Sequence, residues 1–429
     1  MSFGPVAGDK SAGNSDLHAE SIVRGDCPIV LRRIDGPEAS ELFVHCRPPT
    51  GMTEGAAQAE AVYSEICDVL AAEGASFGSV VSETVFLRNL RTSVASVREA
   101  RDRVLAACAG ASHRPATTEI EQPPLDERAW LEVSVQAVLP NESPPRFEPI
   151  DARPVCGCAE CDRAQGLRIH IGEEVRFHAG GLCGPGDTAY EQTLGMFALA
   201  EDLLRRAGME FSDVVRTWIH LREIDRDYGD LNRARRAFFA ARGIDPVPAS
   251  TGIGGGPVSE AHDLCLSLYA VKAGRPAIRT VMTSPTLNEA MQYGADFVRG
   301  MKVVETNKVA LHVSGTASID EDGRTAHPDD FEAQADRMLV NVAALLKKQG
   351  ANFGDVVSAI TYLKNPADAG RLRKKLQEAG FEGFPNALVV APICRPDLLC
   401  ETEALAVLPK SAPPHRTAAR DVRGGALAR

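Results

Sequence analysis

Two glutamates near the end of the chain are the strongest candidates for acid–base chemistry. Glu401 and Glu403 fall within residues 399–408, a run with the length and composition of a β-strand. Side chains two residues apart on a strand lie on the same face, so we expect the two carboxylates to be neighbours. Neighbouring carboxylates raise each other's pKa, which suits a general acid. The alternative is a solvent-facing strand on which both glutamates are hydrated.

A cysteine and three cations are further candidates. Cys394 directly precedes Arg395, whose charge lowers a thiol pKa and would make the sulfur reactive. The alternative is a small buried residue ahead of a turn. Arg299, Lys364 and Arg395 are candidates to neutralise a small dicarboxylate, because a buried dianion needs paired cations. The alternative for each is an ordinary surface charge.

Two other patterns resemble ligand sites less closely. A possible metal cluster comprises Cys156, Cys158 and Cys161, followed by His170, His178 and Cys183. Its C-x-C-x-x-C spacing is not the paired C-x-x-C of a structural zinc site, so we expect unligated thiols and no metal. The glycines at 180–186 and 252–256 do not link a strand to a helix as a phosphate loop does, so we expect turns and no nucleotide cofactor.

The composition excludes several classes of protein. The chain has 429 residues, of which 44% are hydrophobic, and a formal net charge of −11, which argues against a broad basic surface for nucleic acids. Its apolar runs are far shorter than the roughly 20 residues of a membrane-spanning helix. The N-terminal residues lack the apolar core of a secretory signal. Together with an odd number of cysteines, eleven, this predicts a reduced, cytoplasmic protein.

The candidate residues belong to a pattern that occurs three times. Segments beginning at residues 74, 208 and 350 share the sequence Gly-x-x-Phe-x-x-Val-Val. The spacing makes each copy the size of a domain rather than one turn of a solenoid. Before each glycine, apolar residues recur at three- and four-residue spacing, which predicts a helix that ends in a left-handed glycine cap.

The remaining elements also repeat. A strand rich in β-branched residues follows each glycine, at 81–87, 215–221 and 357–363. A second helix comes next, then a strand pair, and a hairpin opens each copy. This order predicts an α+β fold in which each module is a mixed sheet with two helices on one face.

We divide the chain accordingly. We expect a disordered leader at 1–25, module 1 at 26–140, a linker carrying the cysteine cluster at 141–165, module 2 at 166–274, module 3 at 275–410 and a disordered tail at 411–429.

The repeat resembles the Rid/YjgF/UK114 family. Residues 350–365 match Gly-x-x-Phe-x-Asp-Val-Val-x-x-x-x-Tyr-Leu-x-Asn, and residues 399–407 match Leu-x-Glu-x-Glu-Ala-Leu-Ala-Val. The resemblance implies chorismate-mutase-like modules that assemble in threes around a central barrel, with ligand clefts between neighbours. Three fused modules would then form an intramolecular pseudo-trimer, either monomeric or weakly self-associating. Imine-hydrolysing members carry a carboxylate-binding arginine at positions that match Thr117, Ser250 and Ala387 here.

Modules 2 and 3 resemble the chorismatases, a branch of the same superfamily. The matching segments are 243–255, 292–299, 313–317 and 394–403. The resemblance implies that Glu401 is the catalytic acid. It also implies that Gly315 and Cys394 form the pair that marks members making 3-hydroxybenzoate. The other substrate-binding candidates are Tyr293, Arg299, Lys364, Arg395 and Arg242, while Arg235 falls where the family carries a substrate-binding tyrosine.

The leading hypothesis is therefore an enzyme that converts chorismate to a hydroxybenzoate and pyruvate without metal, in a cleft between modules 2 and 3. One alternative is a hydrolase acting on another small imine or enamine. Another is a non-catalytic pseudo-trimer that binds a small carboxylate. We expect neither a nucleic-acid nor a membrane partner.

Overall fold

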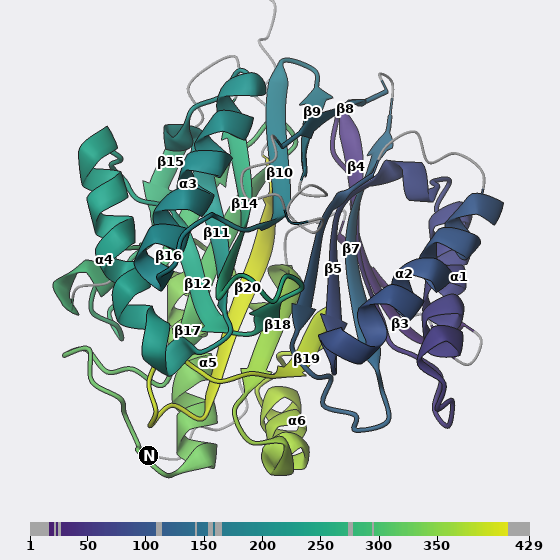
Figure 1. The fold of residues 1–429 in the computed structure, drawn as a ribbon. Helices are drawn as coiled ribbons and strands as arrows, with labels where there is room; N and C mark the ends of the chain where they lie inside the picture. Colours follow the sequence, from purple (N-terminus) through teal and green to yellow (C-terminus); the bar gives the residue numbers. More distant parts are fainter. Residues whose placement is uncertain are drawn as a thin grey trace, which may run out of the picture.

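The strands form three sheets that face one another, with the helices on the outside (Figure 1). The computed structural model describes residues 17–20, 23–24, 27–108, 114–141, 144–152, 158, 165–272, 278–293 and 296–410. Among these residues, no helix combines the length and apolar character needed to cross a membrane.

Each sheet contains six corresponding strands in the same spatial order. The first runs β1 (Leu17–Glu20), β3 (Cys27–Ile34), β4 (Ala39–Cys46), β7 (Leu131–Pro140), β5 (Val80–Leu87) and β6 (Ala116–Glu121). The second runs β8 (Arg146–Asp151), β9 (Gln165–Ile171), β10 (Glu174–Leu182), β14 (Leu264–Lys272), β11 (Val214–Leu221) and β12 (Ala249–Gly254). The third runs β15 (Ile278–Val281), β16 (Gly300–Val304), β17 (Lys308–Ala317), β20 (Cys400–Pro409), β18 (Val356–Leu363) and β19 (Asn386–Val390).

These sheets are mixed, as predicted. The pairs β5/β6, β11/β12 and β18/β19 are parallel and the other pairs within the three sets of six are antiparallel. Two short strands, β2 (Val23–Arg24) and β13 (Gly256–Pro257), extend the first sheet. Single turns of 3-10 helix occur at Phe77–Ser79, Phe211–Asp213, Ala290–Tyr293, Phe353–Asp355 and Pro366–Asp368.

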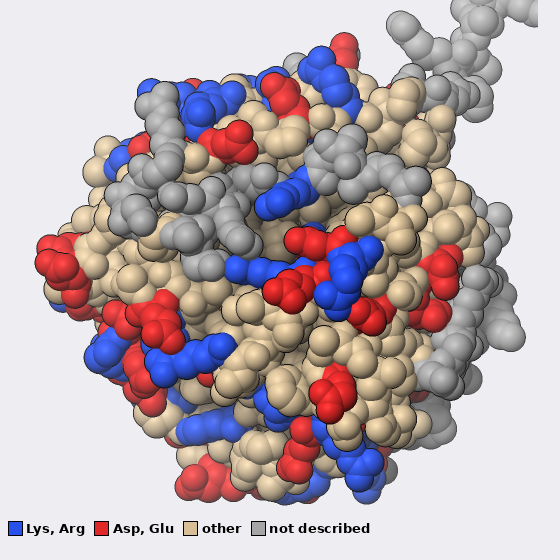
Figure 2. All heavy atoms as spheres, turned by 45° about the vertical axis from the view of Figure 1, so that its right-hand side comes forward, with Lys and Arg blue, Asp and Glu red and all other residues tan. Residues whose placement is uncertain are grey.

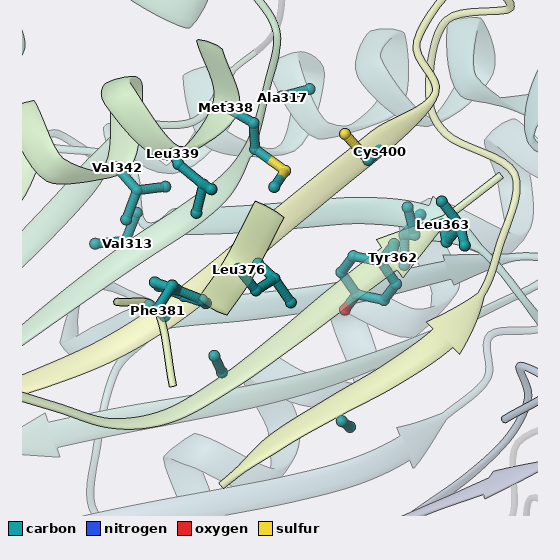
Figure 3. Close-up of a cluster of buried hydrophobic side chains, with 14 of the residues drawn as sticks. Val313, Ala317, Met338, Leu339, Val342, Tyr362, Leu363, Leu376, Phe381 and Cys400 are labelled. Carbon is teal, nitrogen blue, oxygen red and sulfur yellow. The ribbon is translucent and has the colours of Figure 1, made fainter. Parts of the chain in front are cut away.

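Two helices cover the outer face of each sheet. They are α1 (Gly55–Ala72) and α2 (Leu90–Ala107), α3 (Ala189–Arg206) and α4 (Ile224–Arg242), and α5 (Phe331–Lys347) and α6 (Ala369–Glu378). In module 3, Met338, Leu339 and Val342 of α5 belong to the same buried cluster as Val313 and Cys400 of the sheet (Figure 3).

The predicted glycine caps are confirmed. Gly74, Gly208 and Gly350 have φ angles of 75°, 73° and 79° after α1, α3 and α5. In each case the next residue's amide donates back to the helix, as Ala75 N does to Leu70 O at 2.8 Å. This geometry favours glycine because a Cβ is disfavoured at positive φ.

Two segments expected to be irregular contain edge strands. β1 lies in the expected disordered leader 1–25, and β8 lies in the expected linker 141–165; both occupy the sheet position that β15 holds in module 3. The side chains of β8 are all exposed or half-buried and do not alternate regularly between the two, so the sequence lacks the apolar periodicity that marks a strand. The expected tail 411–429 lies outside the described residues.

Backbone pairing joins every pair of modules into a ring. Strand β13 of module 2 pairs with β6 of module 1. Bridges connect Pro124 of module 1 with Val389 of module 3, and Ala249 of module 2 with Val298 of module 3. The three modules therefore form an intramolecular pseudo-trimer.

A buried ion cluster connects strands β4, β10 and β17, one from each module. Glu41 accepts from Arg176 Nη1 at 2.7 Å and from Lys308 Nζ at 2.6 Å, and Arg176 Nε also donates to Glu174 at 2.6 Å. Burial raises the pKa of Glu41, but the charges of Arg176 and Lys308 outweigh this effect and hold the pKa well below its ordinary value. Glu305 adds a third carboxylate, 2.9 Å from Arg176 Nη2.

On the face drawn in Figure 2, basic and acidic side chains are interspersed rather than gathered by sign.

The ion cluster predicts a large effect for Arg176→Met. This change leaves three buried carboxylates with Lys308 as the remaining cation of the cluster, and we expect the free energy of unfolding to fall by about 3–5 kcal/mol in urea titrations. The matched control is Arg205→Met, because the Arg205 side chain is 73% exposed in its pair with Asp202. That variant should lose at most about 1 kcal/mol. Equal losses in the two variants would contradict the assignment.

Candidate active site

The three junctions between modules differ in the side chain at one corresponding strand position. The register places Glu132 opposite Phe86, Cys265 opposite His220 and Glu401 opposite Tyr362. A carboxyl is therefore present in modules 1 and 3 and is replaced by a thiol in module 2.

The wall that faces this position also differs. In β12 of module 2 it is Ser250, Thr251 and Gly252, whereas the corresponding residues of β19 in module 3 are Asn386, Ala387 and Leu388. At the junction of modules 3 and 1 the apolar Leu388 therefore takes the place of Gly252, and Glu132 is hydrogen-bonded to His45 at 3.1 Å. The junction of modules 2 and 3 thus combines a carboxyl with small, polar facing residues.

A cavity of about 330 Å³ lies at that junction. Module 2 contributes Tyr228, Asn232, Ser250, Thr251 and Gly252, and module 3 contributes Phe297, Arg299, Gly315, Ala317, Ile319, Cys394, Arg395, Leu398 and Glu401. The structure therefore brings Glu401, Cys394, Gly315, Arg299 and Arg395 together, as the sequence predicted for a cleft between these modules.

Glu401 is built to carry a proton at neutral pH. Its side chain is 4% exposed, and burial raises its pKa to about 8. The neighbouring Glu403 contributes to this increase in the pKa, while Arg299 and Arg216 oppose it. Both glutamates are buried in β20, so the alternative of a hydrated strand is wrong.

Gly315 makes room for this carboxyl. It lies in an irregularity of β17 between Val313 and Thr316. A Cβ at Gly315 would lie 2.1 Å from Glu401 Oε1 and 3.0 Å from Thr251 Cγ2. Its amide donates to Thr251 Oγ1 at 2.9 Å, which ties module 3 to the opposite wall. Any larger residue displaces the acid.

Two guanidinium groups line the cavity. Arg299 is 3% exposed and is held by the backbone and side-chain oxygens of Asn288 at 2.9 and 3.1 Å. Arg395 Nη1 donates to Gly323 O at 2.8 Å. With Glu401 protonated, the cavity is net positive at neutral pH and suits an anionic ligand.

A third guanidinium lies behind the cavity wall. Arg235 of α4 donates to Asn232 Oδ1 at 2.6 Å and to Ser250 Oγ at 3.3 Å. It therefore orients two residues that do line the cavity.

The expected reactivity of Cys394 is wrong. Burial, assisted by the charge of Glu401, raises the pKa of this thiol to about 12, and the nearby Arg395 only partly offsets the increase. The thiol stays protonated and contributes shape rather than a nucleophile, because the thiolate is the reactive form.

Three other predicted residues are not placed at the cavity. Lys364 is exposed and donates to the backbone oxygen of Pro396. Arg242 forms an ion pair with Glu201 and lies beside a different surface groove. Tyr293 falls in the 3-10 turn Ala290–Tyr293, and its side chain lies outside the described part of the chain.

The sequence pointed to the strand of the module 2 wall, within the matched segment 243–255, and to Arg235, but not to Tyr228 and Asn232. Tyr228, Asn232 and Arg235 of α4 follow spacings of four and three residues, which puts them on one helix face. A buried arginine in the middle of an amphipathic helix was the available signal.

The junction of modules 1 and 2 holds a second cavity, of about 260 Å³, lined in part by Arg98, Arg101 and Thr117. Cys265 lies at the position of the acid, and burial raises its pKa to about 12.

The predicted cysteine cluster is described only in part. Cys158 lies 3.8 Å from His262 Nε2, whereas Cys156 and Cys161 lie outside the described residues. Within the described ranges, no group of three or more His, Cys, Asp or Glu side chains is arranged to hold a metal ion.

Comparisons with known proteins agree with this architecture. The family model for endoribonuclease L-PSP matches residues 49–139 and 289–408. A 3-hydroxybenzoate synthase of Streptomyces hygroscopicus is 27% identical over 262 residues, covering 55% of this chain and 74% of that protein. A RutC family protein of Pyrococcus abyssi is 31% identical over 97 residues, covering 22% of this chain and 76% of that protein.

A solved structure shares the fold. The crystal structure of a chorismatase superposes with a TM-score of 0.56 at 19% identity, covering 77% of this chain and 93% of that one. The three sheets, the repeated order of elements and these matches agree, and the chain belongs to the Rid/YjgF family, the family of endoribonuclease L-PSP.

Proposed function

We propose that the chain is a chorismatase-like enzyme that converts chorismate to 3-hydroxybenzoate and pyruvate at the junction of modules 2 and 3. The observation that carries the proposal is Glu401, a buried carboxyl that holds its proton to about pH 8 beside two guanidinium groups. A dicarboxylate substrate requires those cations, and cleavage of an enol ether requires that proton.

In the proposed reaction Arg299 and Arg395 hold the substrate carboxylates. Glu401 donates its proton to the methylene carbon of the enolpyruvyl group. The neighbouring ring hydroxyl loses its proton and its oxygen bonds to the ether-bearing ring carbon, and the bond between that carbon and the ether oxygen breaks as pyruvate leaves. The resulting ring oxide opens at its other carbon, and the carbon that keeps the oxygen loses its proton, which gives the aromatic ring with the hydroxyl at the 3-position. The two products together contain the atoms of chorismate, so no water is consumed. The Gly315–Cys394 pair, which borders Glu401, supports the 3-hydroxybenzoate type.

Replacing the acid tests the proposal directly. Glu401→Gln keeps the shape of the side chain but removes the proton donor, so kcat should fall by about 10²–10⁴-fold while chorismate binding, followed by calorimetry, persists. Liquid chromatography should show 3-hydroxybenzoate and pyruvate from the unmodified protein. The matched control is Glu378→Gln, on a 53% exposed side chain of α6, with unchanged kcat. Full turnover by Glu401→Gln would refute the assignment.

The pH dependence follows from the same group. The pKa of Glu401 is raised from 4.5 to about 8, so the acid form persists well above the range of an ordinary carboxyl. If Glu401 is the proton donor, kcat/KM for chorismate is constant near neutral pH and declines as the pH rises through about 8. A profile that increases through this range would instead identify Glu401 as a base.

The close approach at Gly315 gives a steric test. Gly315→Ala pushes the Glu401 carboxyl aside, and kcat/KM should fall by about 10²-fold, the usual consequence of misplacing a catalytic group by about 1 Å. Gly370→Ala is the matched control, because no atom lies within 4 Å of a Cβ at that helical position. Activity should be unchanged in the control. Equal activity in both variants would show that the acid is not held against Gly315.

A further inference from the structure

Two sets of three corresponding positions surround the central axis, where the three sheets enclose a further cavity of about 140 Å³. Four of these positions are serines and two are charged: Ser82, Arg216 and Ser358 on β5, β11 and β18, and Ser134, Ser267 and Glu403 on β7, β14 and β20. The charged pair occurs at the junction that also holds Glu401.

The pair is fully enclosed. Arg216 Nη2 donates to Glu403 Oε2 at 2.8 Å, and the two side chains are 2% and 7% exposed. Trp218 Nε1 and the Tyr362 hydroxyl also donate to Glu403, at 2.5 and 3.3 Å. Glu403 is thus a hydrogen-bond acceptor fixed from three sides.

Arg216 also reaches the active-site wall. The same Nη2 atom donates to Thr251 Oγ1 at 2.5 Å, and Thr251 in turn accepts from the amide of Gly315. Glu401 is therefore flanked twice by this network. One link runs along β20 from Glu403, and the other runs through Thr251 and Gly315.

The fold does not need a charge at this position. At the junction of modules 1 and 2, Ser267 bonds Thr118 directly at 2.7 Å, and these residues correspond to Glu403 and Thr251. Two neutral hydroxyls close that junction. Burying an ion pair carries a desolvation penalty that often exceeds its Coulombic gain, so the pair is a poor explanation for stability.

We propose that the Arg216–Glu403 ion pair is a positioning element that holds the Glu401 carboxyl in place, with Glu403 offsetting the Arg216 charge so that Glu401 stays protonated. This inference rests on the proposed role of Glu401 as an acid. Arg216 and Glu403 need not touch substrate, and they act through Thr251, Gly315 and the shared strand.

The charges around Glu401 fix the expected direction. The charged groups that face it are Glu403 on β20, Arg216 on β11, Arg299 ahead of β16 and Arg395 in the loop before β20. After burial, Glu403 is the largest influence that raises the pKa of Glu401, and Arg299 and Arg216 lower it. Cys394, Cys400 and Tyr362 stay uncharged near neutral pH because burial raises their pKa values, and Tyr228 of α4 bonds Cys394.

The test follows the Glu401 proton without substrate. Protein containing glutamate labelled with carbon-13 at the side-chain carboxyl is titrated by NMR, and the Glu401 signal is the one absent in Glu401→Gln. In Glu403→Gln the unpaired Arg216 charge remains, so the midpoint should fall by about 1 pH unit or more. Adding Arg216→Gln removes that charge and should return the midpoint most of the way. The pH at which kcat/KM declines on the basic side should rank the variants in the same order as the Glu401 midpoints.

Glu119→Gln is the matched control, since it removes the carboxylate of a half-buried ion pair with Arg98 at the junction of modules 1 and 2. Its Glu401 midpoint should equal that of the unmodified protein. If Glu403→Gln fails to fold, the Arg216→Ser and Glu403→Ser double variant carries the serines that the other junctions carry. An unchanged midpoint in every variant, or a rise in Glu403→Gln, overturns the inference. Shifted midpoints in a protein that does not turn over chorismate would instead overturn the proposed function alone.

Discussion

Each module has one sheet face that only the other two modules can cover. Its helices occupy the outer face, so the inner face must be buried against neighbouring sheets. Backbone pairing closes the ring at each junction, and the cluster of Glu41, Arg176 and Lys308 neutralises charges that closure removes from water. The candidate site depends on the same closure, because its two walls belong to different modules.

Much of the fold could be predicted because its signals are local. Neighbouring residues determine both the glycine that ends a helix, as at Gly74, and the apolar face of that helix. Because these features recur three times, the sequence predicted three modules. The edge strands β1 and β8 carry no such signal. An edge strand pairs through its backbone on one side and leaves polar side chains in solvent, so no burial pattern marks it.

The site was predicted more completely on the module 3 wall than on the module 2 wall. Glu401, Gly315 and Arg299 lie in module 3 within a recognisable linear pattern, whereas Thr251 and Tyr228 come from module 2 and meet them only in the folded ring. The chemistry of single groups also depends on surroundings that the sequence does not show. The arginine next to Cys394 suggested a thiolate, but burial and a neighbouring carboxyl have the larger effect.

The central ion cluster has a consequence for symmetry. Strand register shows that Glu41, Arg176 and Ala310 occupy one position in the three modules, so an anion, a cation and a small apolar residue share a single axis. Three identical subunits would bring three like charges, or none, to that point. Fusion into one chain allowed the three positions to become complementary. A homotrimer of module 1 alone would place three glutamates there. Each module in its present sequence therefore requires two neighbours that differ from it.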